Sequence, residues 1–139
     1  MAGVADRVDF VHGDPADLLA AAPGDHALVL ALDVLHDTRD PAATLRAVRS
    51  ALADDGVLLL LESLGTDRPT DNRGPAAALL YGASVLYSVP IGRAGGGAAV
   101  GMLGLPPGVL TRLCGEAGLG HVRQLPSPTP LNALYEIRP

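Results

Sequence analysis

The 139 residues suffice for one ordinary domain, and because 48% of them are apolar we expect a packed core rather than disorder. A formal net charge of −5 gives no basic surface for phosphate backbones, so we predict no nucleic-acid partner. The one cysteine, Cys114, excludes an internal disulfide and is typical of a reducing compartment, so we predict a cytoplasmic protein. No metal site is predicted, since the four histidines are scattered and no CxxC spacing occurs.

The sequence predicts no membrane segment. Its first ten residues have no basic region followed by an apolar stretch, which a signal peptide requires. The longest nearly uncharged stretch, residues 74–92, is rich in Gly, Ala and Ser, and its apolar part is too short and too weak to span a bilayer. We therefore expect no membrane partner.

The first half of the chain is typical of alternating strands and helices. Residues 7–13 alternate apolar and polar side chains and predict a strand that ends at a Gly-Asp-Pro turn, followed by a short helix. Residues 27–32 and 57–62 are continuous apolar runs, as expected of parallel strands buried on both faces. Between them Asp40 is the expected N-cap of a helix that residues 54–56 end. This strand–helix–strand order predicts an α/β fold.

In the second half of the chain, the pattern of apolar residues is less regular before residue 106. Residues 76–89 have a helical pattern with Pro90 beyond its end, and the Gly-rich stretch 92–101 is interpreted as a flexible lid. Residues 106–120 predict a helix that begins at two prolines, and residues 121–127 and 131–139 predict two closing antiparallel strands at a sheet edge. Because no linker or repeat interrupts the chain, we expect one domain.

The ordered set of motifs resembles the second half of a class I S-adenosylmethionine-dependent methyltransferase. The matching pieces are "RVDFVHGDPADL", the run from "HALVLALDVLHD" to "LLLLES", and "PPGVLTRLCGEAGLGHVRQL" followed by "NALYEIRP". The "LHD…DP" turn and the glutamate that closes the next strand are similar to small-molecule O-methyltransferases. The resemblance implies a truncated Rossmann-like sheet of about three parallel strands plus a C-terminal antiparallel hairpin, flanked by helices. It implies a single partial domain over 1–139, with 64–105 as an insertion or lid over the substrate.

The sequence departs from the family at its beginning. The family's first strand runs into a turn of the form E/D-x-G-x-G, and its second strand ends in an acid for the ribose hydroxyls. This sequence has neither, so we expect that it starts about halfway through the fold and binds S-adenosylmethionine weakly or not at all by itself. The two missing strands would separate residues 7–13 from 27–32. We expect that the first strand slides over to pair with 27–32, or that another chain fills the gap.

Three residues are implied on the cofactor side. Asp14 follows the first predicted strand, where it is either a capping residue of the turn or an acceptor for the adenine amino group in a complete enzyme. Pro15 would pack on the adenine ring, and Asp33, at the end of the next strand, would line the cofactor pocket.

On the acceptor side, the resemblance implies that His36 removes the proton from a substrate hydroxyl, with Glu62 and an acid such as Asp37 orienting the imidazole. The alternatives are that His36 packs or caps a helix and that Asp37 faces solvent. Tyr81 and Tyr87 either line an apolar substrate pocket or belong to the core, and the core interpretation is slightly favoured.

The sequence leads to two main functional hypotheses, one for an enzyme and one for a non-catalytic protein. The first is methyl transfer from S-adenosylmethionine to oxygen, rather than nitrogen or carbon, of a small organic acceptor in the complete enzyme. The second is a non-catalytic remnant or partner subunit that completes a split methyltransferase, with the exposed strand edge as the interface to itself or to another chain. A third, weaker alternative is a binding module that uses the pocket under the lid. The sequence does not specify the acceptor.

Overall fold

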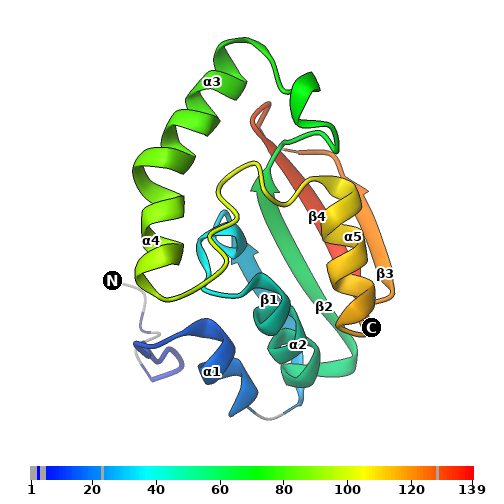
Figure 1. The fold of residues 1–139 in the computed structure, drawn as a ribbon. Helices are drawn as coiled ribbons and strands as arrows, with labels where there is room; N and C mark the ends of the chain where they lie inside the picture. The colour runs from blue at the N-terminus through cyan, green and yellow to red at the C-terminus, as the bar shows by residue number, and fades with distance from the viewer. Residues whose placement is uncertain (1–2, 4–5, 23, 128) are drawn as a thin grey trace.

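The computed structural model describes residues 3, 6–22, 24–127 and 129–139. Its centre is a four-stranded sheet in the order β1-β2-β4-β3, formed by His26–Leu32, Leu52–Ser63, Asn132–Arg138 and His121–Leu125 (Figure 1). β1 and β2 are parallel, and β4 is antiparallel to both of its neighbours. The α/β class and the closing hairpin are confirmed. Within the hairpin only β3 lies at the sheet edge, because β4 pairs on both sides.

The helices α1 (Pro15–Ala20), α2 (Pro41–Ala51) and α5 (Pro107–Glu116) agree with the predicted ones. The backbone N–H of Ala43 donates to the Asp40 side chain over 3.0 Å, so Asp40 is the N-cap of α2 as predicted. α2 ends earlier than expected, and residues 54–56 lie inside β2. Two short 3-10 turns, η1 (Leu35–Asp37) and η2 (Pro69–Asp71), complete the loops after β1 and β2.

In the described part of the chain, helices cover only one face of the sheet. Helices α2 and α5 lie on the same face of the sheet (Figure 1), and side chains of α2, α5, β2 and β4 share one buried cluster, which includes Leu45, Leu58 and Leu110. On the opposite face Leu28, Leu30 and Leu32 of β1 are about half exposed, at 50%, 57% and 56%. The prediction that β1 is buried on both faces is therefore wrong for this chain, because α2 and α5 both pack on the same side.

The first predicted strand does not form. Residues 8–12 have no strand structure, and Phe10 is 97% exposed. A strand needs a neighbour for its backbone hydrogen bonds, and among the described residues β1 pairs only with β2. The expectation that residues 7–13 slide over to pair with β1 is wrong, and the outer edge of β1 stays open in the described part of the chain.

The helix after η2 is longer than predicted. It runs continuously through α3 (Gly74–Ala83), a π-helical stretch η3 (Ser84–Ser88) and α4 (Val89–Ala94) (Figure 1). Pro90 was expected beyond the end of this helix but lies within it. A proline inside a helix lacks one backbone donor and crowds the preceding turn, and the wider π turn directly before Pro90 relieves this conflict.

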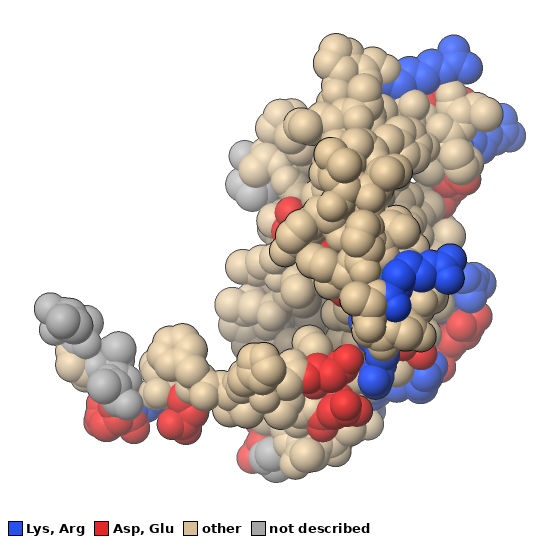
Figure 2. All heavy atoms as spheres, turned by 60° about the vertical axis from the view of Figure 1, so that its left-hand side comes forward, with Lys and Arg blue, Asp and Glu red and all other residues tan. Residues whose placement is uncertain are grey.

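The combined helix Gly74–Ala94 has 21 residues, and its most apolar 18-residue window has a mean hydropathy of 1.3 and is only 17% buried. By length and composition it could cross a membrane, contrary to the sequence-based expectation. One such helix is weak support for a membrane segment, because helices of soluble proteins meet the same criterion. Figure 2 shows its outer face as a largely uncharged surface with arginine side chains toward its ends.

Candidate active site

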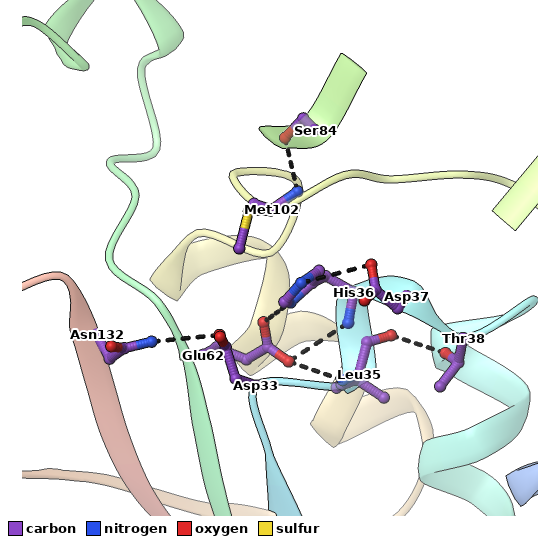
Figure 3. A network of polar contacts seen from close by, with 9 residues as sticks. All are labelled: Asp33, Leu35, His36, Asp37, Thr38, Glu62, Ser84, Met102 and Asn132. Carbon is purple, nitrogen blue, oxygen red and sulfur yellow. Dashed lines mark hydrogen bonds and ion pairs between the residues drawn. The ribbon is translucent and has the colours of Figure 1, made fainter. Parts of the chain in front are cut away.

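The candidate site lies where β1 and β2 end. Because the two strands are parallel, their carboxyl ends meet at one edge of the sheet, which is where ligands bind in open α/β sheets. β1 ends at Leu32 and leads through η1, which carries His36, into the N-cap of α2. β2 ends with Glu62 and Ser63. The two strand ends therefore place His36 and Glu62 side by side (Figure 3).

His36 and Glu62 form a buried pair. The Nδ1 atom of His36 lies 2.6 Å from Oε2 of Glu62, and each side chain is 1% exposed. Oε1 of Glu62 also accepts the backbone N–H groups of Leu35 at 2.9 Å and His36 at 3.3 Å. A carboxylate that only accepts hydrogen bonds fixes the ring proton on Nδ1, so the neutral imidazole keeps its free electron pair on Nε2.

Asp37 faces the other ring nitrogen. Its Oδ1 atom lies 3.5 Å from Nε2 of His36 and is buried without a hydrogen-bond partner among the described residues. Burial by itself would lower the pKa of His36. The hydrogen bond to Glu62 and the negative charges of Glu62, Asp37 and Asp33 outweigh it, so the pKa of His36 is raised above 6.5. The arrangement provides a histidine that is oriented on one side and can take up a proton on the other.

Asp33 has a strained backbone at the same strand end. Its φ is +57°, a left-handed conformation that is uncommon outside glycine, and its N–H donates to Leu61 O over 2.8 Å. Its Oδ1 atom accepts a hydrogen bond of 3.2 Å from Nδ2 of Asn132, the first residue of β4 (Figure 3). The exposed carboxylate of Asp33 is thus held at the edge of the site, and its contact with the cofactor stays a prediction.

The sequence predicted no metal site, yet ligand atoms of Asp33, His36 and Glu62 lie within 4.8 Å of one another. The hydrogen bonds above already engage both oxygens of Glu62 and Nδ1 of His36. His36 and Glu62 thus already belong to the hydrogen-bonded network described above.

Asp14 and Pro15 begin α1. The N–H of Ala16 donates to Oδ1 of Asp14 over 2.9 Å, so Asp14 caps the helix, while its Oδ2 lies 3.6 Å from Nε of Arg39. The capping interpretation is confirmed, and the adenine contact stays a prediction. Arg39 connects Asp14 to the turn that carries His36. The sequence analysis did not single out Arg39, because no known motif includes an arginine at this position.

Tyr81 and Tyr87 are not core residues. They are 40% and 60% exposed, so the favoured core interpretation is wrong. The hydroxyl of Tyr81 donates to Pro69 O over 3.4 Å and accepts from Nδ2 of Asn72 over 3.3 Å, which ties it to the loop before its own helix. A role of either tyrosine in substrate binding stays a prediction.

Several solved structures are similar to almost the whole chain. They include TnmH (25% identity, TM-score 0.71), the mitomycin 7-O-methyltransferase MmcR (24% identity, TM-score 0.62) and the trans-methyltransferase CalH in complex with SAH (25% identity, TM-score 0.59). The alignments cover 96%, 98% and 95% of this chain. The chain has the fold of the C-terminal portion of a class I S-adenosylmethionine-dependent methyltransferase.

This methyltransferase portion spans only about a third of the solved chains that it matches, namely 36%, 35% and 35% in the same order. A curated protein, fumosorinone synthetase from Cordyceps fumosorosea (strain ARSEF 2679), is 46% identical over 55 residues, which are 40% of this chain and 1% of that protein. No protein-family model matches the chain. The absence of the N-terminal glycine-rich motif from the sequence agrees with a portion of this size.

The methyltransferase portion also contains a cavity, which lies largely against the segment 64–105 that was expected to cover the substrate. It has a volume of about 210 Å³ and lies between the start of α3, the loop after β2 and the turn before β4. Its wall includes Leu64, Asn72, Arg73, Leu80, Leu103 and Leu131. These residues come from segments far apart in the chain, so no local sequence pattern could have revealed the cavity.

Proposed function

We propose that this chain forms the acceptor side of an enzyme that transfers a methyl group from S-adenosylmethionine to oxygen of a small organic molecule. His36 is the general base. The single observation that carries this proposal is the buried hydrogen bond of 2.6 Å between His36 Nδ1 and Glu62 Oε2, at the carboxyl ends of two parallel strands. The pairing leaves Nε2 to accept the proton of the acceptor hydroxyl, because Glu62 holds the other ring proton.

S-adenosylmethionine, when bound, would supply a methyl group activated on a sulfonium. Asp14, Pro15 and Asp33 are the residues of this chain that would contact it, but they supply only part of a site, since the glycine-rich loop and the ribose acid are not in the sequence. In the reaction, His36 would take the hydroxyl proton as the acceptor oxygen replaces sulfur on the methyl carbon, and S-adenosylhomocysteine would leave as the neutral thioether. Glu62 keeps the ring oriented and stabilises the imidazolium that results.

Methyl transfer is tested in a reconstituted enzyme. The chain would be combined with a polypeptide that supplies the missing strands and the E/D-x-G-x-G turn, and activity would be measured toward a panel of phenols and alcohols. His36→Gln is expected to lower the rate by about 10²–10⁴-fold, the usual contribution of a general base. His121→Gln, which changes an exposed histidine of β3, is the matched control. Equal activity of both variants would exclude His36 as the base.

A second function is supported by the open edge of β1. Its outer backbone groups have no strand partner among the described residues, and three of its leucines are half exposed. Such an edge pairs readily with another strand, so the chain would be a partner subunit that completes a split methyltransferase or associates with itself. Apolar exposure of this kind is costly in a free monomer.

Isothermal titration of the purified chain with S-adenosylhomocysteine tests whether the chain binds the cofactor product by itself. Binding in the micromolar range would mean that the chain holds the cofactor product without the usual loop, which supports an enzyme that acts by itself. No binding by a folded chain would point to a fragment of an enzyme or to a partner subunit, and the reconstituted enzyme described above then separates these two. Analytical ultracentrifugation of Leu30→Glu then tests the β1 surface, because a charge there is expected to weaken any association.

A further inference from the structure

The inner face of the helix over the site carries two serines. Its buried stripe runs through Ala77, Leu80, Ser84, Ser88 and Gly92, whereas the rest of the helix is largely exposed. Oγ of Ser84 accepts a hydrogen bond of 2.8 Å from the backbone N–H of Met102. Ser88, one turn further on, is 0% exposed, and its Oγ has no hydrogen-bond partner among the described residues. Of these two serines, Ser84 is therefore the one whose hydroxyl bonds to the following loop in the described structure.

The segment held by Ser84 is a tight turn over residues 101–104, called here the gate turn. The N–H of Gly104 donates to Gly101 O over 2.9 Å and closes the turn. Gly101 has a φ of +72°, and a Cβ atom at this position would lie 3.1 Å from Oγ of Ser84. The turn depends on glycine for its backbone conformation and for its close approach to the helix.

The two central residues of the gate turn face two different places. Figure 3 shows the side chain of Met102 pointing from the loop toward the His36–Glu62 pair, with Ser84 on its other side. Leu103 instead lines the cavity of about 210 Å³. His36 is 1% exposed, so a substrate can reach Nε2 only after a neighbouring group moves.

We propose that the gate turn controls access from the cavity to His36 and that the Ser84 hydroxyl is the latch that keeps it closed. This inference rests on the proposed function, since it names the route by which the acceptor reaches the base. The cavity wall combines Leu64, Leu80 and Leu103 with Asn72 and Arg73. It fits a small, mainly apolar hydroxylated molecule with a polar or anionic substituent that Arg73 can pair with.

Accessibility measurements on the full chain test the latch. Ser84→Ala removes the hydrogen bond to Met102, and Ser88→Ala is the matched control, because it deletes a buried hydroxyl without a partner one turn away. In Ser84→Ala the amide of Met102 is expected to exchange its hydrogen about fivefold faster or more, as for one lost hydrogen bond. Carbethoxylation of His36 by diethylpyrocarbonate, followed by peptide mass spectrometry, is expected to accelerate, with exposed His121 as the internal reference.

Met102→Ala separates the gate from the latch. It shortens the side chain that points toward His36 but keeps the backbone N–H that Ser84 holds. The reaction of His36 should therefore accelerate while amide exchange at position 102 stays slow. The proposal is overturned if Ser84→Ala and Ser88→Ala give the same exchange and modification rates, or if Met102→Ala leaves His36 protected. Neither assay measures methyl transfer. The gate proposal can therefore be refuted while His36 remains the general base, and His36 can be excluded as the base while the gate proposal stands.

Discussion

Replacing Glu62 by Gln tests the centre of the site. Glu62 accepts three hydrogen bonds while 1% exposed, two from backbone N–H groups and one from His36 Nδ1. A glutamine oxygen can still accept from the backbone, but its NH₂ group would then face Nδ1. Nδ1 could accept a hydrogen bond from this NH₂ group only if the ring proton moved to Nε2. That tautomer blocks Nε2, the atom that is proposed to act as the base. The variant should therefore change both stability and histidine titration.

The expected loss in the free energy of unfolding is about 1.5–3 kcal/mol, the range for a hydrogen bond that involves a charged group. The pKa of His36 should fall in the variant, because the hydrogen bond and the largest of the negative charges that raise it come from Glu62. In the wild type the folded pKa lies above the unfolded value of 6.5. The stabilisation from this shift is complete below pH 6.5 and is lost as the pH rises through the folded pKa.

Urea unfolding at several pH values and NMR titration of the imidazole measure both effects. In the wild type the free energy of unfolding is expected to decrease as the pH rises above 6.5, and in Glu62→Gln this decrease should be smaller. The control is Glu116→Gln, which removes an exposed carboxylate paired with Arg112 over 2.8 Å, and it should leave the His36 titration unchanged. An unchanged pKa of His36 in Glu62→Gln, or equal stability of the two variants, would refute the assigned role of Glu62.

Three further predictions concern the scaffold. Asp40→Ala removes the cap that accepts from Ala43 N and should destabilise the chain by about 1 kcal/mol in urea unfolding. Cys114 is 0% exposed and burial raises its pKa to about 12, so it should react with a disulfide reagent only after unfolding, and rapid reaction of the native chain would contradict this. Gly56→Ala would place a Cβ atom 2.6 Å from His26 O, so the backbone must shift; a loss of about 1–3 kcal/mol is expected, and unchanged thermal stability would argue against the β1–β2 register.

Much of the scaffold could be predicted because it follows from local chemistry. Asp40 and Pro41 specify the start of α2 wherever the helix packs, and the paired prolines do the same for α5. The apolar runs of β1 and β2 with one helix between them determined the parallel pair. The contact between His36 and Glu62 was predicted from the resemblance to O-methyltransferases, and it agrees with the strand positions, since parallel strands end at the same edge.

Other features were decided by tertiary structure, because they depend on what each segment finds beside it. Residues 7–13 have a strand pattern, but a strand forms only with a hydrogen-bonding neighbour, and none of the described residues provides one. Pro90 marks a helix end in sequence, yet a π turn and packing on η1 carry the helix past it. The bond from Asn132 to Asp33 joins residues 99 positions apart, and the one from Met102 to Ser84 joins a loop to a helix. Composition and spacing carry information about the segment in which a residue lies. They carry none about hydrogen bonds between distant segments, because these bonds form only after the sheet has brought the segments together.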